Sequence, residues 1–266
     1  MLICVVNISE GRNGALVGEI ADAAGTALLD VHTDPDHNRA VLTLVGEEAP
    51  RTVTRSAVAR LDLGGHDGVH PRIGVVDVVP FVPIGAHTLR QALDARDTFA
   101  AWAGAELDLP CFLYGPERTL PHVRRHAFVD LEPDVGPSAP HPTAGAASVG
   151  ARNPLVAYNL WLADAEVHEA RQIAASLRGP AVRALGLRLG DQVQISTNLV
   201  APLTFGPADV YDLVKKVAAI DRAELVGLIG RDVLEGIAEE RWAELDLADR
   251  QTIEARISAR GLDRDV

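Results

Sequence analysis

The sequence predicts an α/β protein of the α+β sandwich type, with two ferredoxin-like βαββαβ subdomains in tandem. Three observations support this fold class. Of the 266 residues, 47% are hydrophobic, which is enough for large cores and fits two domains of typical size. The same order of strand and helix patterns occurs in each half of the chain. A proline-rich stretch at 115–142 separates the two series and is expected to be a linker or a wrapping loop without regular structure.

The first half opens with the apolar, β-branched run LICVVNI, which is typical of a buried strand. Leu16, Val17 and Ile20 then recur at helical spacing. Strands are expected at 2–8, 26–31, 40–46, 73–84 and 109–115, and helices at 14–24, 48–62 and 88–105. The run IGVVDVVPFVPI gives the strongest strand pattern of the chain. Pro80 and Pro83 put the end of this strand at a sheet edge.

The second half repeats the β-α-β-β-α-β order. Strands are expected at 155–162, 181–189, 192–200 and 224–230, and helices at 164–178 and 208–220. The middle two strands form a hairpin around Gly190 and Asp191. The tail at 231–266 is helical and charged. We place the first subdomain at 1–140 and the second at 141–266. Because each sheet has helices on one face, the two sheets are expected to cover each other or to line a cleft.

Charge and composition exclude several classes of partner. The chain has 25 Lys and Arg against 37 Asp and Glu, a net charge of -12, so no attraction to nucleic acid or to an anionic membrane is expected. An anionic ligand must therefore be held by local arginines or by backbone N–H groups. Cys4 and Cys111 lie in apolar runs and are expected to be buried thiols of a reduced, cytoplasmic protein. No run approaches the ~18–20 apolar residues of a membrane span, and the N-terminus lacks a signal-peptide pattern.

Two loops of the first half carry polar side chains after strands. In NISEGRN, a cap by Ser9, Gly11 or Asn13 would leave N–H groups beside Arg12, where a carboxylate can bind. Plain helix capping explains the same residues. In DPDHNR, the two aspartates at 34 and 36 suggest calcium. The loop lacks the glycine and the acidic residue that a calcium loop needs at its sixth and twelfth positions, so we reject this interpretation.

The third loop is HDGVHPRIGVVD. His66 and His70 are four residues apart, as in a helical metal site, but Gly68 and Pro71 make a continuous helix improbable. We therefore expect no metal. His70, directly before the strongest strand, suits a neutral general base because an imidazole titrates near pH 7. A loop histidine that only forms hydrogen bonds is the alternative. The run GPSAPHPTAGAASVGA has the wrong spacing for a phosphate loop and suits a rigid wall against a flat ligand.

Taken in order, NISEGRN, DPDHNR, HPRIG, GPSAPHPTAGA, AYN and QISTNL resemble the glutamate formimidoyltransferase family. The resemblance runs from Val5 to about Gly230. It implies two similar halves whose sheets face each other across a folate-binding tunnel. It also implies a reaction in which N-formimidoyl-L-glutamate and tetrahydrofolate give 5-formimidoyltetrahydrofolate and glutamate. Tetrahydrofolate is then a co-substrate, no metal takes part, and the working form is a homodimer, which is also the commonest oligomer.

The resemblance assigns roles residue by residue. The catalytic histidine of the family falls on His70, whose imidazole would take the N5 proton and later protonate the leaving glutamate nitrogen. The folate-contacting segment falls on Gly136, Pro137, Ser138, Ala139, Pro140, His141, Pro142, Thr143, Ala144 and Gly145. Substrate-binding positions are Asn7, Ser9, Glu10, Arg12, His32, Asn38, Arg39, Arg72 and Asp77.

The charges of these side chains indicate which group of the substrates each one could bind. The cationic amidinium favours a carboxylate such as Glu10 or Asp77, and the substrate carboxylates call for Arg12, Arg39 or Arg72. Each has a structural alternative: Glu10 and Arg12 could cap the first helix, Asp77 could tie a strand end, and Arg72 could form an ion pair.

The chain departs from its relatives at Val69, where they usually have Glu, and at His32, where they usually have an acidic residue. These departures weaken electrostatic support for a cationic amidinium. A metal-assisted hydrolase using His66, His70 and Asp36 or Asp77 therefore stays open. So does a folate-binding paralogue with another one-carbon donor or little activity.

Overall fold

The computed structural model describes residues 1–68 and 71–262. The chain forms two compact units, a larger one at Met1–Asn153 and a smaller one at Pro154–Leu262. Sequence analysis put the division at 140. The structure puts it after Asn153 because residues Ala147–Ala151 form a strand, β6, that pairs in parallel with β4 and β5 of the larger unit.

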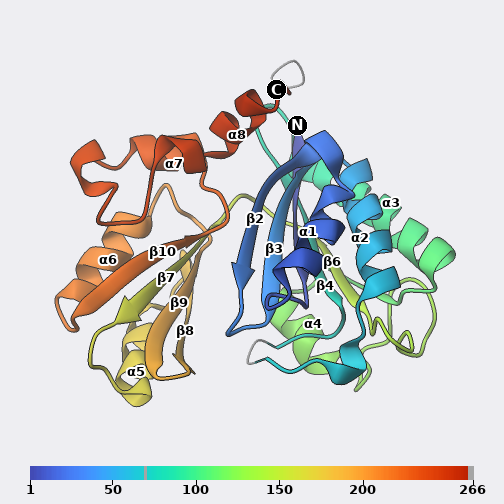
Figure 1. The fold of residues 1–266 in the computed structure, drawn as a ribbon, viewed down its shortest axis with the longest axis horizontal. Coiled ribbons are helices and arrows are strands. Elements are labelled where there is room, and N and C mark those ends of the chain that lie inside the picture. Colours follow the sequence, from blue (N-terminus) through green and yellow to red (C-terminus); the bar gives the residue numbers. More distant parts are fainter. Residues whose placement is uncertain (69–70, 263–266) are drawn as a thin grey trace. The chain divides into compact units, whose positions relative to one another are not determined.

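The larger unit contains a ferredoxin-like core with two added strands (Figure 1). The core elements are β1 (Leu2–Ile8), α1 (Gly14–Asp22), β2 (Leu28–Asp34), β3 (Arg39–Val45), α2 (Glu48–Arg60) and β4 (Val76–Pro83). They are followed by α3 (Leu89–Leu107), β5 (Cys111–Tyr114), α4 (Leu120–His126) and β6, with 3₁₀ turns at Gly25–Ala27 and Leu63–Gly65. The strand order is β2-β3-β1-β4-β6-β5, so its first four strands have the ferredoxin-like order that the sequence predicts.

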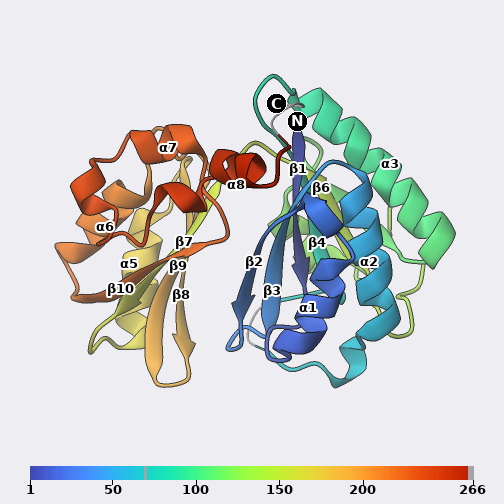
Figure 2. The ribbon, with the colours of Figure 1, turned by 45° about the horizontal axis from the view of Figure 1, so that its top comes forward.

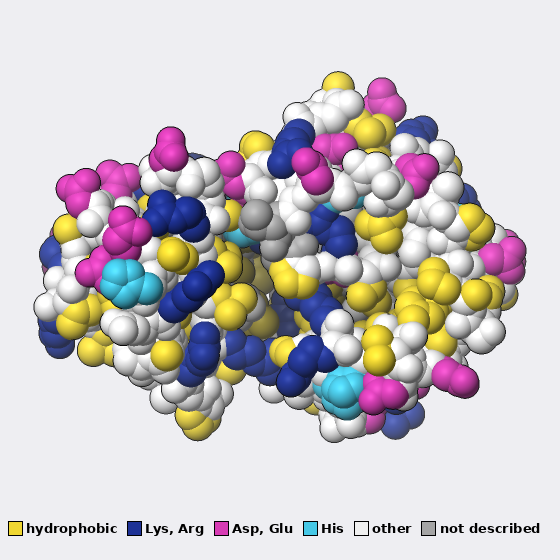
Figure 3. Space-filling model, turned by 90° about the horizontal axis from the view of Figure 1, so that it is seen from below, with side chains coloured by type: hydrophobic (Ala, Val, Ile, Leu, Met, Phe, Trp, Pro, Cys, Tyr) yellow, Lys and Arg dark blue, Asp and Glu magenta, His cyan; other side chains and the backbone are white. Residues whose placement is uncertain are grey.

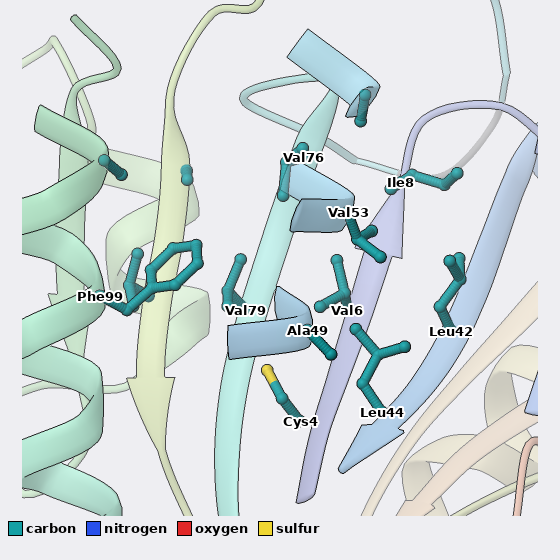
Figure 4. Packing of buried hydrophobic residues seen from close by; sticks show 14 of the residues in the cluster. Cys4, Val6, Ile8, Leu42, Leu44, Ala49, Val53, Val76, Val79 and Phe99 are labelled. Carbon is teal, nitrogen blue, oxygen red and sulfur yellow. The ribbon is translucent and has the colours of Figure 1, made fainter. Parts of the chain in front are cut away.

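The core of this unit lies between the sheet and the helices α1, α2 and α3 (Figure 2). Alternate residues of β1 point the same way, so Cys4, Val6 and Ile8 all face α2, where Val53 meets them (Figure 4). Helix α4 packs on the opposite face, over Phe112 of β5 and other residues of a smaller apolar cluster.

Both cysteines are free and buried, as expected. Burial raises the pKa of the Cys4 thiol well above its usual range, and burial with the nearby charge of Asp134 raises that of Cys111 to about 12. Both thiols are therefore protonated at neutral pH and contribute to apolar packing.

The smaller unit is a four-stranded sheet with the order β10-β7-β9-β8. Its elements are β7 (Val156–Leu162), α5 (Val167–Leu177), β8 (Val182–Leu189), β9 (Gln192–Leu199), α6 (Pro207–Lys215) and β10 (Ile220–Val226). The predicted hairpin is confirmed, with Leu189 opposite Gln192 and Gly190 at a positive φ of 56°. The tail is partly helical, with α7 (Arg231–Glu235), α8 (Ile253–Ala259) and 3₁₀ turns at Glu239–Arg241 and Asp249–Gln251.

Three local expectations are wrong. The helix expected at 208–220 ends at Lys215, and the strand expected at 224–230 lies at Ile220–Val226. The proline-rich stretch contains α4, because the Thr119 side chain accepts a bond from His122 N–H and Pro121 lies in the first turn, where a helix tolerates proline. Strand β4 is not at an edge but lies between β1 and β6. Val79 and Pro80 have no partner in β1. Pro80, which lacks a backbone N–H, therefore lies where the ladder between β1 and β4 is interrupted. Within the two described ranges, no helix is long and apolar enough to cross a bilayer.

Candidate functional site

Most of the candidate residues lie at one end of the larger unit. Strands β1 and β2 end there, and β3 and β4 begin there, because β3 runs antiparallel to β1 and β2, and β4 runs antiparallel to β1. Ser9 connects two of the loops, with its N–H donating to Val75 O and its hydroxyl to Gly74 O, both at 2.8 Å. Val75 N–H in turn donates to Ala144 O at 2.9 Å. The NISEGRN loop, the segment before β4 and the end of the proline-rich stretch therefore form one assembly.

Asn38 fastens the β2–β3 turn to this assembly. Its side-chain oxygen accepts from Gly11 N–H at 3.0 Å, and its amide nitrogen donates to Asp67 O at 2.8 Å. A Cβ on Gly11 would lie 2.4 Å from Asp34 O, so only glycine allows the loops to approach this closely. Asn38 itself has a φ of 48°, a conformation that asparagine tolerates.

The charged residues of NISEGRN hold the start of α1 and the neighbouring turn. The Glu10 carboxylate accepts from the N–H groups of Arg12 and Asn13 at 2.8 and 2.9 Å, which is the capping role that the sequence left open. The Arg12 guanidinium donates to Pro35 O at 3.0 Å and forms an ion pair with the exposed Asp67. Arg12 is half-exposed, so its other N–H groups can reach a ligand.

Arg72 lies between the β2–β3 turn and His66. Its guanidinium donates to His37 O at 3.2 Å and contacts the His66 imidazole. Burial lowers the pKa of the Arg72 guanidinium. The positive charges of Arg12 and Arg124 lower it further, while Asp77 opposes them. Several guanidinium groups thus share this end of the unit, and Figure 3, which views the molecule from this end, shows a group of Arg side chains on the larger unit.

Asp77 is one of the most deeply buried charged residues in the described part of the chain, at 2% exposed. One carboxylate oxygen accepts from Ile73 N–H at 2.8 Å, and the other accepts from Arg124 of α4 at 2.5 Å. The carboxylate therefore ties the start of β4 to α4, and both of its oxygens have protein partners.

A second buried carboxylate, Asp34, pairs with His37 in the β2–β3 turn. It accepts from His37 N–H at 2.9 Å and contacts the His37 ring. Burial alone would raise the pKa of Asp34, but these two bonds and the charges of His37 and Arg39 together lower it to about 2. Arg39 stands directly opposite Asp34 in the β2–β3 ladder.

Two further candidates lie on the sheet. In the ladders, Asn7 of β1 is opposite Val41 of β3, which is opposite His32 of β2. Residues paired in this way point to the same face, so Asn7 and His32 lie in one row across the sheet. The Asn7 amide donates to Val5 O at 3.1 Å. His70, the candidate base, lies outside the described residues.

The candidate folate segment consists of an exposed part and a turn that ends in two buried residues. The exposed residues are Gly136, Pro137, Ser138, Ala139, Pro140, Pro142 and Thr143. The turn from His141 to Gly145 is closed by two backbone bonds of 2.8 and 3.0 Å, and the His141 ring accepts from Ala144 N–H at 2.9 Å. Ala144 and Gly145 are buried. Gly145 has a φ of 70°, and a Cβ on it would lie 2.4 Å from Ile73 O. The 136–145 segment, the candidate wall against a flat ligand, is therefore held in place by the contacts of this turn with the rest of the larger unit.

Sequence analysis missed Arg124 and His37. Arg124 was hidden because its stretch was interpreted as a loop, although Thr119 and Pro121 together are a helix-start signal. His37 was not considered further once the calcium interpretation of its loop had been rejected. The signal that could have found it is the Asp-x-x-His spacing, in which the Asp34 side chain accepts a hydrogen bond from a backbone N–H of its own turn. No three His, Cys, Asp or Glu side chains of the described ranges are placed to hold a metal ion together.

Known proteins match the chain along most of its length. The model of the formiminotransferase domain, N-terminal subdomain, matches residues 1–152. The glutamate formimidoyltransferase of Streptococcus pyogenes serotype M1 is 35% identical over 277 residues, covering 92% of this chain and 91% of that protein. That of Thermoplasma acidophilum is 32% identical, covering 89% and 90%. The formimidoyltransferase-cyclodeaminase of Sus scrofa is 32% identical, covering 85% of this chain and 49% of that protein. The chain therefore belongs to the glutamate formimidoyltransferase family of enzymes, as its motifs predict.

Proposed function

We propose that the protein transfers the formimidoyl group of N-formimidoyl-L-glutamate to N5 of tetrahydrofolate. The observation that carries the proposal is the group of guanidiniums beside a preformed wall. Arg12 and Arg72 supply positive charge for substrate carboxylates, and the 136–145 segment offers an exposed, proline-rich surface held by the rigid turn before β6. A rigid wall loses little conformational entropy when a flat ligand binds to it.

The chemistry requires one base and no covalent enzyme intermediate. N5 of tetrahydrofolate attacks the amidine carbon, and a neutral imidazole takes the N5 proton. The carbon–nitrogen bond to glutamate then breaks as the same imidazole protonates the leaving nitrogen, so one proton is moved and none is lost. We assign this role to His70 because it corresponds to the catalytic histidine of the family and lies two residues before Arg72 in the sequence.

The carboxylates near this site have protein partners. Glu10 caps α1, and Asp77 binds Ile73 N–H and Arg124. We therefore propose that these two residues hold the loops in place, and that the substrate is oriented mainly through its own carboxylates. Arginine suits this task because its planar guanidinium can bind a carboxylate with two parallel hydrogen bonds.

The test is an assay of formimidoylglutamate with tetrahydrofolate, followed by acid treatment and detection of the 5,10-methenyl product by its absorbance. We expect turnover that depends on both substrates. Consumption of formimidoylglutamate without tetrahydrofolate would point instead to a hydrolase, and elemental analysis of the protein with a chelator control would then test for a metal. A protein that binds folinate but converts neither substrate would be a binding paralogue.

Replacement of His70 is the first mutational prediction. His70→Ala is expected to lower turnover by roughly 10² to 10⁴, the usual contribution of a general base, with little change in folate affinity. The rate of the unmodified enzyme should fall below about pH 6.5, because a protonated imidazole cannot accept the N5 proton. His168→Ala, on the exposed surface of α5, is the control and should keep full activity. Wild-type turnover in His70→Ala would refute the assignment.

A further inference from the structure

Three arginines from three segments share the charged end of the larger unit. Arg12 follows β1, Arg72 precedes β4, and Arg124 lies in the last turn of α4. The positive charges of Arg12 and Arg124 both act on Arg72, so the three guanidinium groups share one electrostatic neighbourhood. Bringing like charges together costs free energy unless an anion lies among them. The arrangement therefore favours an anionic ligand.

The carboxylates that balance this charge differ in burial. Asp67 pairs with Arg12, but its side chain is 84% exposed, and such a pair is weak in water. The Asp77 side chain is 3% exposed and is fixed by both Arg124 and Ile73 N–H. A ligand carboxylate can thus displace Asp67 from Arg12, whereas Asp77 stays in place. With Asp67 displaced and Glu10 turned to the backbone of α1, a positive excess is left for a ligand that carries two carboxylates.

Arg124 is held in a position that leaves part of its guanidinium available. One terminal nitrogen donates to Asp77 at 2.5 Å, and the side chain is 22% exposed. Its Nε is buried and has no hydrogen-bond partner among the described residues. A guanidinium has five N–H donors, so one bond to Asp77 fixes its plane without using its capacity. The next residue, Arg125, is exposed and donates to Pro121 O of its own helix.

We propose that Arg124 is a third binding residue for the carboxylates of a glutamyl group, and that Asp77 is the positioning residue that orients it. The identity of the ligand rests on the proposed function. Formimidoylglutamate and tetrahydrofolate both carry a glutamyl group with two carboxylates, so the same chemistry could recognise either one. The position of Arg124 beside Asp77 and Arg72 favours neither of the two, and the experiment separates them.

The experiment measures KM for each substrate in four variants. Arg124→Met should raise KM for the substrate whose glutamyl group it binds by roughly ten- to hundredfold, the usual effect of losing a charge-assisted hydrogen bond. Its kcat should change by less than about threefold, because the contact is made equally in the ground and transition states. Arg124→Lys should recover part of the affinity, since it keeps the charge but not the planar fork. Asp77→Asn should raise KM less than Arg124→Met does.

Arg125→Met is the matched control on the same helix and should have an unchanged KM. A rise confined to formimidoylglutamate assigns the site to the amino-acid substrate, and a rise confined to tetrahydrofolate assigns it to the folate tail; either supports the proposal. Unchanged KM values for both substrates in a folded Arg124→Met protein overturn it. If Arg124→Met does not fold, the KM values of Arg124→Lys and Asp77→Asn take its place. A raised KM for one substrate supports the proposal, and unchanged KM values for both substrates overturn it.

A calorimetric titration with L-glutamate separates this inference from the proposed function. Binding that is lost in Arg124→Met and kept in Arg125→Met supports the glutamyl site even when the wild-type protein shows no transfer. Binding that is equal in the wild type and in Arg124→Met refutes the site even when transfer is observed.

Discussion

Asp34 and His37 show how a single pair of residues can fix the geometry of a loop. Two bonds from His37 reach the Asp34 carboxylate, and His37 O in turn accepts from Arg72. The pair therefore holds the β2–β3 turn in the shape that receives the arginine. Its carboxylate has a pKa lowered from 3.8 to about 2, so the folded protein prefers the charged form more strongly than the unfolded chain does.

This preference gives a prediction for acid stability. The shift corresponds to about 2 kcal/mol of folding free energy, present in full above about pH 4 and lost as the pH falls toward 2. Asp34→Asn should therefore lower the free energy of unfolding by about that amount at pH 7, measured with urea, and the difference from the wild type should shrink between pH 4 and 2. Asp36→Asn, an exposed residue in the same turn, should change stability by less than about 0.5 kcal/mol at any pH. An equal effect of the two substitutions would contradict this account.

The roles that follow from local spacing could be predicted from the sequence, and those that depend on distant partners could not. Glu10 and Asn13 cap α1 within three residues, and the capping pattern is visible in NISEGRN. Asp77 meets Arg124 across 47 positions, and no local pattern reports such a pair. The sequence offered Asp77 either as a carboxylate for the substrate or as a residue that ties a strand end, and only the tertiary structure shows that Arg124 binds it.

At the scale of elements, the turn from His141 to Gly145 positions the wall before β6. It is bonded to itself and to the segment before β4, since Leu63 N–H donates to Thr143 O and Val75 N–H to Ala144 O. The wall is thus coupled to the loop that carries Arg72. Substitutions meant to probe ligand contact belong in its exposed part, for example at Ser138, because a change at Gly145 would alter the fold as well.

Gly145→Ala is expected to lower the free energy of unfolding by roughly 3 kcal/mol. A positive φ of 70° accounts for roughly 1–2 kcal/mol, and the overlap of the new Cβ with Ile73 O accounts for the rest. Gly46→Ala in the same unit is the matched control, because Gly46 has a φ of 78° with no atom within 4 Å of its virtual Cβ. Gly46→Ala should lower the free energy of unfolding only by the roughly 1–2 kcal/mol that the positive φ accounts for. An equal decrease in the free energy of unfolding for the two variants, measured with urea, would show that the turn accommodates the new Cβ at no energetic cost.

Most strands were predicted to within a few residues because their apolar runs are short and bounded by turn residues, but β6 was not predicted and β10 begins at Ile220 rather than at 224. The run LICVVNI and β1 have the same bounds, and the hairpin of β8 and β9 is placed by Gly190. Two rules failed for reasons that the structure explains. Proline usually marks an edge strand, but Pro80 lies where β1 and β4 do not pair. Proline also usually ends a helix, but Pro121 lies in the first turn of α4.

At the scale of the whole molecule, the repeated βαββαβ order produces the same order of four core strands in both units, and the larger unit adds β6 and β5 to it. Each unit has its own apolar core, so each can report separately on ligand binding. The candidate site described here lies within the larger unit. Stability changes caused by a ligand should therefore be found mainly in that part of the chain.

Hydrogen exchange with folinate tests this expectation. A ligand at one hundred times its Kd stabilises the state that binds it by about 2.7 kcal/mol. Folinate should slow exchange in the peptides of Met1–Asn153 that open only by unfolding of this unit, including β1 and β4. A folate analogue without the glutamyl tail should give a smaller effect. Protection confined to Pro154–Leu262 would place the folate site in the other unit.

The insertion of β6 between β4 and β5 has a consequence for synthesis on the ribosome. The ferredoxin-like part of the larger unit is complete in sequence once β4 has been made. The edge of β4 that faces away from β1 stays unpaired until Ala147–Ala151 has also been made, because β6 is its partner there. Strand β5 also pairs with β6, so it joins the sheet only at that stage. For more than sixty residues of translation, a nascent chain therefore presents an apolar strand edge, and the unit can close only when residue 151 has left the exit tunnel.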